Sequence, residues 1–390
     1  MRNLLILLLL FSLSPVIADD HQNRPVLVGF DGAYSVKNAT SAAGIELGIK
    51  TALHEINEAG GVLGGRQLKF IKMDNHSVPA RGLSNLKKMA QMRDLVAIIG
   101  GRFSTVLLQQ LPYLHELGVP MIDVWAAADG ITDHDYSPSY TFRVSLKDEW
   151  AMPHMINYLR SSGHQRIGLI LPSNGWGRSN ERSLQKYKLQ NPELDIVDIV
   201  WYSFGAQKML DHYNKLLISG ADSVILVAND FEASILVREL GENPSVKRLP
   251  IASHWGVSGG NMVESSGSTL TELDFTLIQT FSFYNLPEAK QLRFLNAAAK
   301  VSSIDSLDDI AAPVGTAHAY DAIHLLALAI NKAGSTNRSH IRDALESGLE
   351  FDGLIKNYAP AFTADNHDAL SPDILLMARF REDGTIFPIR

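Results

Sequence analysis

The chain contains no cysteine among its 390 residues. Disulfides, thiolate metal ligands, a cysteine nucleophile and a lipid attached to cysteine after export are therefore excluded. Positive charge is also in deficit: the formal net charge is −7, and the sequence contains no basic run. It therefore shows no positively charged segment that would bind nucleic acid or an anionic membrane. Past the N-terminus no apolar stretch reaches the roughly 20 residues of a membrane helix, and we expect no membrane insertion of the mature chain.

The N-terminus has the layout of a secretory signal peptide. Arg2 supplies a positive charge, residues 4–11 form a short apolar run, and Val16 and Ala18 stand at the −3 and −1 positions of a cleavage site. An uncleaved anchor is the weaker alternative, because the run is too short to span a bilayer. We predict that residues 1–18 are removed and that an unlipidated protein reaches the periplasm.

From Pro25 onward, short β-rich runs alternate with amphipathic segments of helix length. Several runs are almost continuous in Val, Ile and Leu, which is typical of parallel strands buried on both faces. Helical segments end at glycines that precede the next strand, so the order is a repeated βαβ unit with right-handed crossovers. Strands are predicted at 26–30, 67–73, 96–100, 120–124, 166–171, 196–202, 223–228, 249–253 and 276–283, and helices at 44–59, 104–117, 147–162, 207–219 and 231–240.

After residue 284 the alternation of predicted strands and helices ends. Consecutive helices are predicted at 288–301, 314–333 and 339–347, and residues 374–380 and 385–389 predict a hairpin. No linker of biased composition divides the chain, as expected if two lobes are joined by several crossovers.

One motif suggests a hydrolase. Gly256 to Gly260 fits the G-x-S-x-G pattern after a predicted strand, and Asp309 and His318 follow in the order of a catalytic triad. However, the residues after Ser258 begin a helix poorly, and no glycine-rich oxyanion segment precedes them. A turn is therefore favoured, with a serine hydrolase using Ser258 as the weaker alternative. The histidines lack metal-site spacing, so we predict no enzyme activity, metal or cofactor.

The polar and aromatic residues that follow the predicted strands are more informative. In open α/β sheets, ligands bind beyond the carboxyl ends of the strands. Three of the five tryptophans lie there, which favours an aromatic-lined cleft over simple core packing. Ser104 caps a predicted helix, and its hydroxyl and the helix N–H groups could hold an anionic or carbonyl group, with Arg102 adding charge. The predicted ligand-binding residues are Arg102, Phe103, Ser104, Trp125, Ala126, Ala127, Trp176, Asn229, Asp230 and Trp255.

These residues and several longer stretches resemble the type I periplasmic binding proteins, specifically the leucine/isoleucine/valine-binding family of ABC-transporter receptors. The resemblance implies an α/β fold of two doubly wound parallel-sheet lobes, joined by a three-crossover hinge and closing around a ligand. Lobe 1 would comprise residues 24–144 and 281–355, and lobe 2 residues 145–280 and 356–390. The stretches that carry it are 44–65 with Asp74, 99–104, 119–122, 142–143 and 319–322.

The resemblance also assigns roles to single positions. Ser104 matches the ligand-binding serine of the family, Ala126 its backbone contact, and Trp176 the aromatic residue of the second lobe. Ala127 stands where amino-acid binders usually carry a hydroxyl, and Trp255 where they keep a carboxylate for the ligand's ammonium group.

The differences from amino-acid binders at Ala127 and Trp255 determine which ligand we expect. We expect a periplasmic receptor that passes a small planar, aromatic or apolar molecule with one polar end to the membrane subunits of an ABC importer. A standard branched-chain amino acid is not expected. The alternative with the same fold is a soluble ligand-sensing subunit of a membrane signalling receptor.

Overall fold

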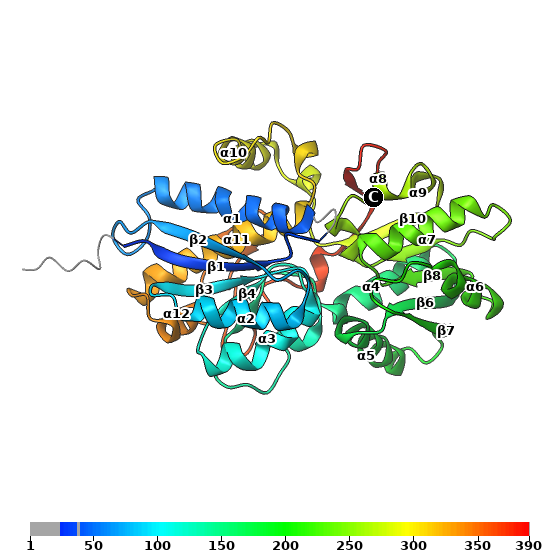
Figure 1. The fold of residues 1–390 in the computed structure, drawn as a ribbon, viewed down its shortest axis with the longest axis horizontal. Coiled ribbons are helices and arrows are strands. Elements are labelled where there is room, and N and C mark those ends of the chain that lie inside the picture. The colour runs from blue at the N-terminus through cyan, green and yellow to red at the C-terminus, as the bar shows by residue number, and fades with distance from the viewer. Residues whose placement is uncertain (1–23, 37–39, 390) are drawn as a thin grey trace, which may run out of the picture.

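The computed structural model describes residues 24–36 and 40–389, and the predicted signal peptide lies outside these residues. Two lobes lie side by side, each built around a sheet with helices on both of its faces (Figure 1). This arrangement confirms the predicted fold of two doubly wound α/β lobes.

Lobe 1 contains five parallel strands in the order β2-β1-β3-β4-β5. Helix α1 packs against α11 on one side of this sheet, while α2 packs against α3. The strands are β1 (Val26–Gly32), β2 (Leu68–Asp74), β3 (Leu95–Gly100), β4 (Met121–Asp123) and β5 (Thr141–Arg143), and the helices are α1 (Thr40–Glu58), α2 (Pro79–Ala90), α3 (Ser104–Glu116), α10 (Glu288–Ala298), α11 (Pro313–Ala333) and α12 (Arg338–Leu345).

Lobe 2 contains seven strands in the order β14-β13-β10-β9-β8-β6-β7. Strands β6 to β10 are parallel, and the predicted C-terminal hairpin adds β13 antiparallel to β10 and β14 antiparallel to β13. The strands are β6 (Arg166–Pro172), β7 (Asp195–Tyr202), β8 (Ser223–Leu226), β9 (Ile251–Ser253), β10 (Phe275–Gln279), β13 (Leu376–Phe380) and β14 (Ile386–Pro388), and the helices are α4 (Asp148–Ser161), α5 (Gly175–Gln190), α6 (Leu210–Ile218), α7 (Asp230–Glu242), α8 (Met262–Ser266) and α9 (Thr269–Glu272).

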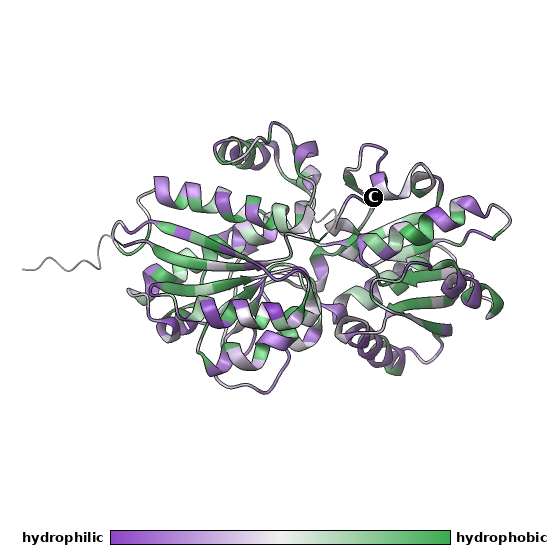
Figure 2. Cartoon of the chain, viewed as in Figure 1, coloured by the Kyte–Doolittle hydropathy of each residue, from purple (hydrophilic) through white to green (hydrophobic). Residues whose placement is uncertain are grey.

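The apolar strand runs account for the two cores. Every residue of β3 and of β8 is buried, and each buried Val, Ile or Leu side chain stabilises the fold by about 1.5–3 kcal/mol relative to exposure. Figure 2 shows these strands as the hydrophobic interior, with polar residues on the outward helix faces. Among the residues that the structure describes, no helix is both long and apolar enough to cross a membrane.

Several elements were not predicted from the sequence, among them β5, α5 and α2. Strand β5 is only three residues long and two of them are polar. Helix α5 is largely polar and offers a thin apolar stripe. Helix α2 follows His76 and Ser77, which both adopt positive φ angles, so its start carries no simple helix signal.

The third crossover lies later than predicted. Tyr358 donates a hydrogen bond to Asp321 of α11 at 2.9 Å, and the Ala369 N–H donates to the Arg143 carbonyl of β5 at 2.8 Å. Both contacts hold the segment up to Ala369 on lobe 1. The chain therefore returns to lobe 2 after residue 369 rather than at 356, because Asp321 and Arg143 bind it from lobe 1.

Candidate ligand-binding cleft

A cavity of about 200 Å³ lies between the lobes, beyond the carboxyl ends of strands from both sheets. That volume is below the roughly 300–1,000 Å³ of typical ligand pockets, so it suits only a small molecule. Eight of the ten predicted residues line it: Arg102, Phe103, Ser104, Trp125, Ala127, Trp176, Asn229 and Trp255. The cavity is completed by Ser77, Pro79, Thr105, Asn174, Phe204 and Gly256.

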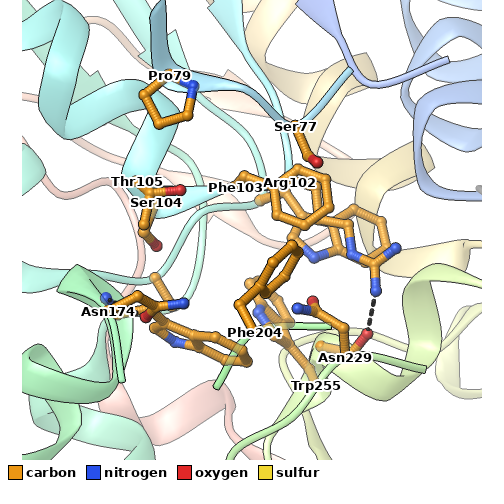
Figure 3. A pocket seen from close by; sticks show the side chains of 14 residues that line it. Ser77, Pro79, Arg102, Phe103, Ser104, Thr105, Asn174, Phe204, Asn229 and Trp255 are labelled. Carbon is orange, nitrogen blue, oxygen red and sulfur yellow. Dashed lines mark hydrogen bonds between the residues drawn. The ribbon is translucent and has the colours of Figure 1, made fainter. Parts of the chain in front are cut away.

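The walls of the cavity are aromatic. Trp125 of lobe 1 and Trp255 of lobe 2 are each 1% exposed, and their ring centroids lie 5.9 Å apart. Trp176, at the start of α5, is fixed by a 3.2 Å hydrogen bond from its Nε1 to Asp148. Phe103 and Phe204 meet edge to face across the lobes at 6.2 Å (Figure 3). Such walls suit a flat apolar body.

Two glycines make room for these rings. A Cβ atom at Gly315 of α11 would lie 2.4 Å from the Trp125 ring, and one at Gly256 would lie 2.7 Å from Trp176 and 2.5 Å from the Ala228 carbonyl. Any larger residue would therefore displace a wall of the cavity.

Trp255 is supported from behind by His318, whose ring centroid lies 5.5 Å away. His318 interacts with the Thr280 hydroxyl at 2.8 Å and with the Val124 carbonyl at 3.0 Å. Burial lowers the pKa of His318 to about 4, so the imidazole is neutral at physiological pH. It adds no charge to the wall.

Hydrogen-bond donors converge at one end of the cavity. Ser104 is the first residue of α3, and the cap position belongs to Phe103, so the predicted capping role of Ser104 is wrong. Its Oγ instead accepts a 3.2 Å bond from the Ala128 N–H, which leaves the Ser104 hydroxyl proton available. The N–H groups of Ser104 and Thr105 precede the first helical bonds, which run from Val106 and Leu107 to Phe103.

A buried ion pair shapes the loop behind these donors. Asp123 accepts bonds from the N–H groups of Trp125 and Ala126, and Arg143 donates to the carbonyls of Ala126 and Ala128 at 3.0 and 2.7 Å. Burial raises the pKa of Asp123, while the Arg143 guanidinium lowers it. The N–H and the carbonyl of Ala126 are therefore both hydrogen-bonded within lobe 1, and Ala126 does not line the cavity.

Arg102 is committed to the opposite lobe. Its guanidinium forms an ion pair with Asp230 and donates to the carbonyls of Gly259 and Gly256 at 2.9 and 2.7 Å. Figure 3 shows Arg102 near Asn229 and Phe103 in the cavity wall. The predicted positive charge is consequently neutralised, and Asp230, whose carboxylate holds Arg102, does not line the cavity.

A second interlobe contact lies beside the donor end. Asp129 of lobe 1 accepts bonds from Ser183 of α5 at 2.9 Å and from the Glu149 N–H at 2.9 Å. Burial, followed by the nearby Asp148 carboxylate, raises the pKa of Asp129 to about 6. Both lobes therefore close on one another at two polar contacts as well as at the aromatic walls.

The hydrolase alternative has no supporting geometry. The Ser258 hydroxyl is buried and donates to the Trp255 carbonyl at 2.7 Å. His318 is bound to Thr280 and Val124, and Asp309 accepts from Ser306, so no hydrogen bond joins the three. Within the described ranges, no cluster of three or more His, Asp or Glu side chains is arranged to hold a metal.

Part of the cavity lining was not predicted from the sequence. Phe204 follows β7 and Ser77 follows β2, so the rule applied to the other strands would have found both. Asn174 likewise follows β6, which ends at Pro172. No local signal marks Pro79, which reaches the cavity through the unusual backbone of the preceding residues.

Comparisons with known proteins agree with this architecture. An amino acid binding protein of Pseudomonas aeruginosa is 21% identical over 235 residues, which are 59% of this chain and 60% of that protein. The chain thus spans less than two thirds of the length of that curated relative.

Two solved structures share the fold. The branched-chain amino acid transporter substrate-binding protein of Streptococcus pneumoniae, in complex with isoleucine, is 20% identical with a TM-score of 0.77, covering 94% of this chain and 99% of that one. An ABC-transporter solute-binding protein of R. palustris, in complex with 4-hydroxybenzoate, is 16% identical with a TM-score of 0.77, covering 94% and 95%.

A family-wide sequence model covers almost the whole described chain. It is the model for the family described as periplasmic binding protein, and it matches residues 25–385. The match contains both sheets, the crossovers between them and the cavity lining. The chain therefore belongs to the periplasmic binding protein family, a family of solute-binding proteins rather than enzymes.

Proposed function

We propose that this protein is an exported receptor that encloses a small planar monocarboxylate, preferably one with an aromatic ring, and presents it to an ABC importer. The observation that carries the proposal is the composition of the cavity wall. Three tryptophans line it, whereas no Asp or Glu side chain among the described residues does.

The missing carboxylate disfavours an amino-acid ligand. A buried ammonium group without a negative partner costs several kcal/mol. Asp230 pairs with Arg102, and Asp148, whose Oδ1 interacts with Trp176 and His254, lies outside the cavity lining. A carboxylate, in contrast, meets the Ser104 hydroxyl and the N–H groups at the start of α3, where the helix dipole favours negative charge.

Relatives of the same fold support both kinds of ligand. One binds isoleucine and another 4-hydroxybenzoate, so the fold alone does not select between them. The tryptophan walls and the absence of an ammonium partner support the aromatic acid for this chain.

Calorimetry tests the proposal directly. We expect benzoate and its ring-substituted relatives to bind with dissociation constants at least tenfold below those of leucine and valine. Native mass spectrometry of freshly purified protein should show a retained ligand of that class. Micromolar binding of leucine or valine, with no response to aromatic acids, would overturn the proposed ligand.

The location and partner are part of the same proposal. Cleavage after Ala18 would release residues 19–390 into the periplasm, and N-terminal sequencing of the mature protein tests this. Uptake of the labelled ligand should fall when the gene is deleted and return when it is restored. Normal uptake together with a lost transcriptional response would instead assign the protein to sensing.

A further inference from the structure

The side chain of Asn229 is buried in the cavity wall without a hydrogen-bond partner. It is 8% exposed, lines the cavity and occupies the cap position of α7, yet it makes no capping bond. No other described residue forms a hydrogen bond with its carboxamide. Buried amides are nearly always hydrogen-bonded, because an unsatisfied one costs about 1–3 kcal/mol. Asn229 is therefore a polar group whose partner is supplied by whatever fills the cavity.

The opposite end of the cavity is rich in hydrogen-bond donors. Asn174 directs its Oδ1 to the N–H groups of Trp176 and Gly177 at 3.0 and 3.1 Å, which leaves its NH₂ group to the cavity. Together with the Ser104 hydroxyl and the start of α3, this end suits an acceptor without protons, such as a carboxylate.

Figure 3 separates the two ends. Ser104, Thr105 and Asn174 lie on one side, Asn229 and Trp255 lie on the other, and Phe204 lies between them. Asn229 carries both a donor and an acceptor, so a hydroxyl group, which can accept from its NH₂ and donate to its oxygen, is the matching ligand group.

We propose that Asn229 is a specificity-determining residue that recognises a hydroxyl on the ring edge remote from the carboxylate. The ligand class is then hydroxy-substituted aromatic carboxylates rather than unsubstituted ones. This inference rests on the proposed function, since it takes the carboxylate to lie at Ser104.

The experiment compares 4-hydroxybenzoate, 3-hydroxybenzoate, benzoate and 4-methylbenzoate by calorimetry. A site that hydrogen-bonds a ligand hydroxyl rejects analogues that lack it, because its own buried groups are left unpaired. For the unaltered protein we expect at least one hydroxybenzoate to bind tenfold or more tightly than 4-methylbenzoate. In Asn229→Leu this preference should disappear while 4-methylbenzoate binding is kept or improved.

A matched control acts at the other end of the ligand. Asn174→Ser keeps a capping oxygen for α5 but removes the NH₂ donor. It should weaken hydroxybenzoate and methylbenzoate by the same factor, so that their ratio is unchanged. Asn229→Ala is the second variant at the site itself. Because Asn229 makes no capping bond, neither of its substitutions removes one from α7, and melting curves verify that both variants fold.

The outcomes separate the two levels of the proposal. If benzoate and 4-methylbenzoate bind as tightly as both hydroxybenzoates, the role of Asn229 is overturned while the aromatic-acid receptor stands. A hydroxyl preference that survives in both Asn229 variants overturns the role as well. If only leucine or valine binds, the proposed ligand class fails and this inference fails with it.

Discussion

Arg102 of lobe 1 and Asp230 of lobe 2 form a buried ion pair across the interlobe cleft, and the carbonyls of Gly256 and Gly259 bind the rest of the guanidinium. Because the two residues belong to different lobes, we expect opening of the cleft to separate them. The pair therefore contributes to the equilibrium between open and closed protein, to which ligand affinity is directly coupled.

Replacing Asp230 by Asn should favour the open form. Closure would then bury the Arg102 charge without its carboxylate, whereas in the open form water solvates it. We expect a loss of about 2 kcal/mol in closure, which is roughly a 30-fold weaker affinity. Calorimetry measures the affinity and small-angle scattering the change of shape.

The matched control is Glu272→Gln. Glu272 pairs with Arg248 within lobe 2 at 3.5 Å, and both side chains are exposed, so affinity should stay within twofold. An Asp230→Asn protein that binds as tightly as the unaltered one would show that the pair does not control closure.

Ligand should both close and stabilise the protein. Only the closed form encloses the ligand between the two lobes, so the free energy of unfolding rises with ligand concentration. At 100 times the dissociation constant the gain is about 2.7 kcal/mol, and the melting temperature rises by about a few degrees. A scattering profile that is unchanged by a ligand known to bind would contradict closure.

Intrinsic fluorescence reports the same motion. Trp125 and Trp255 belong to different lobes and their ring centroids lie 5.9 Å apart, so aromatic ligand binding should change their emission. Trp255→Leu should weaken benzoate binding by about 1–2 kcal/mol, roughly 5- to 30-fold, because one ring contact and its buried area are lost.

Trp201→Leu serves as the control for that variant. Trp201 lies outside the cavity lining and stacks with Arg178, whose guanidinium carbon is 4.0 Å from the ring centroid. Its loss should leave affinity unchanged. Micromolar leucine binding that is insensitive to Trp255→Leu would refute the aromatic pocket.

Affinity should increase as the pH falls from 7 to 5. Burial raises the pKa of Asp129 to about 6, and Ser183 of lobe 2 contributes to that burial. We therefore expect closing to take up protons, and acid to favour the closed form by at most about tenfold per pH unit. The raised pKa means that Asp129 lowers the free energy of unfolding as pH rises through this range. Burial also raises the pKa values of Asp31, Asp123 and Asp321 in lobe 1 and of Glu232 in lobe 2. Of these, Glu232 interacts with Arg102 of the opposite lobe, whose positive charge lowers its pKa.

Asp129→Asn should abolish this pH dependence. Calorimetry with benzoate at pH 5, 6 and 7, in buffers of different ionisation enthalpy, measures the proton uptake. An identical pH profile in the variant would assign the titration to another group.

The sequence predicted the elements whose signal is local. Continuous Val, Ile and Leu runs indicated β3 and β8 because burial on both faces requires them. Strand-end reasoning likewise brought Ser104, Trp125 and Trp255 to one cavity. Arg102 was predicted to add positive charge to the ligand site. Its actual partner, Asp230, lies 128 positions away in the sequence, and no local pattern predicts such a contact. The contact between Asp129 and Ser183 escaped prediction for the same reason.

Gly315 is a position at which a single substitution can change the size of ligand that the cavity accepts. It lies on α11, outside the cavity lining, yet it faces the Trp125 ring so closely that a single added methyl group must move that ring. The width of the cavity thus depends on a residue behind Trp125 that does not itself line the cavity. New ligand sizes can be explored by substitutions at Gly315 while Ser104, Asn174 and Asn229 keep the polar contacts of the cavity intact.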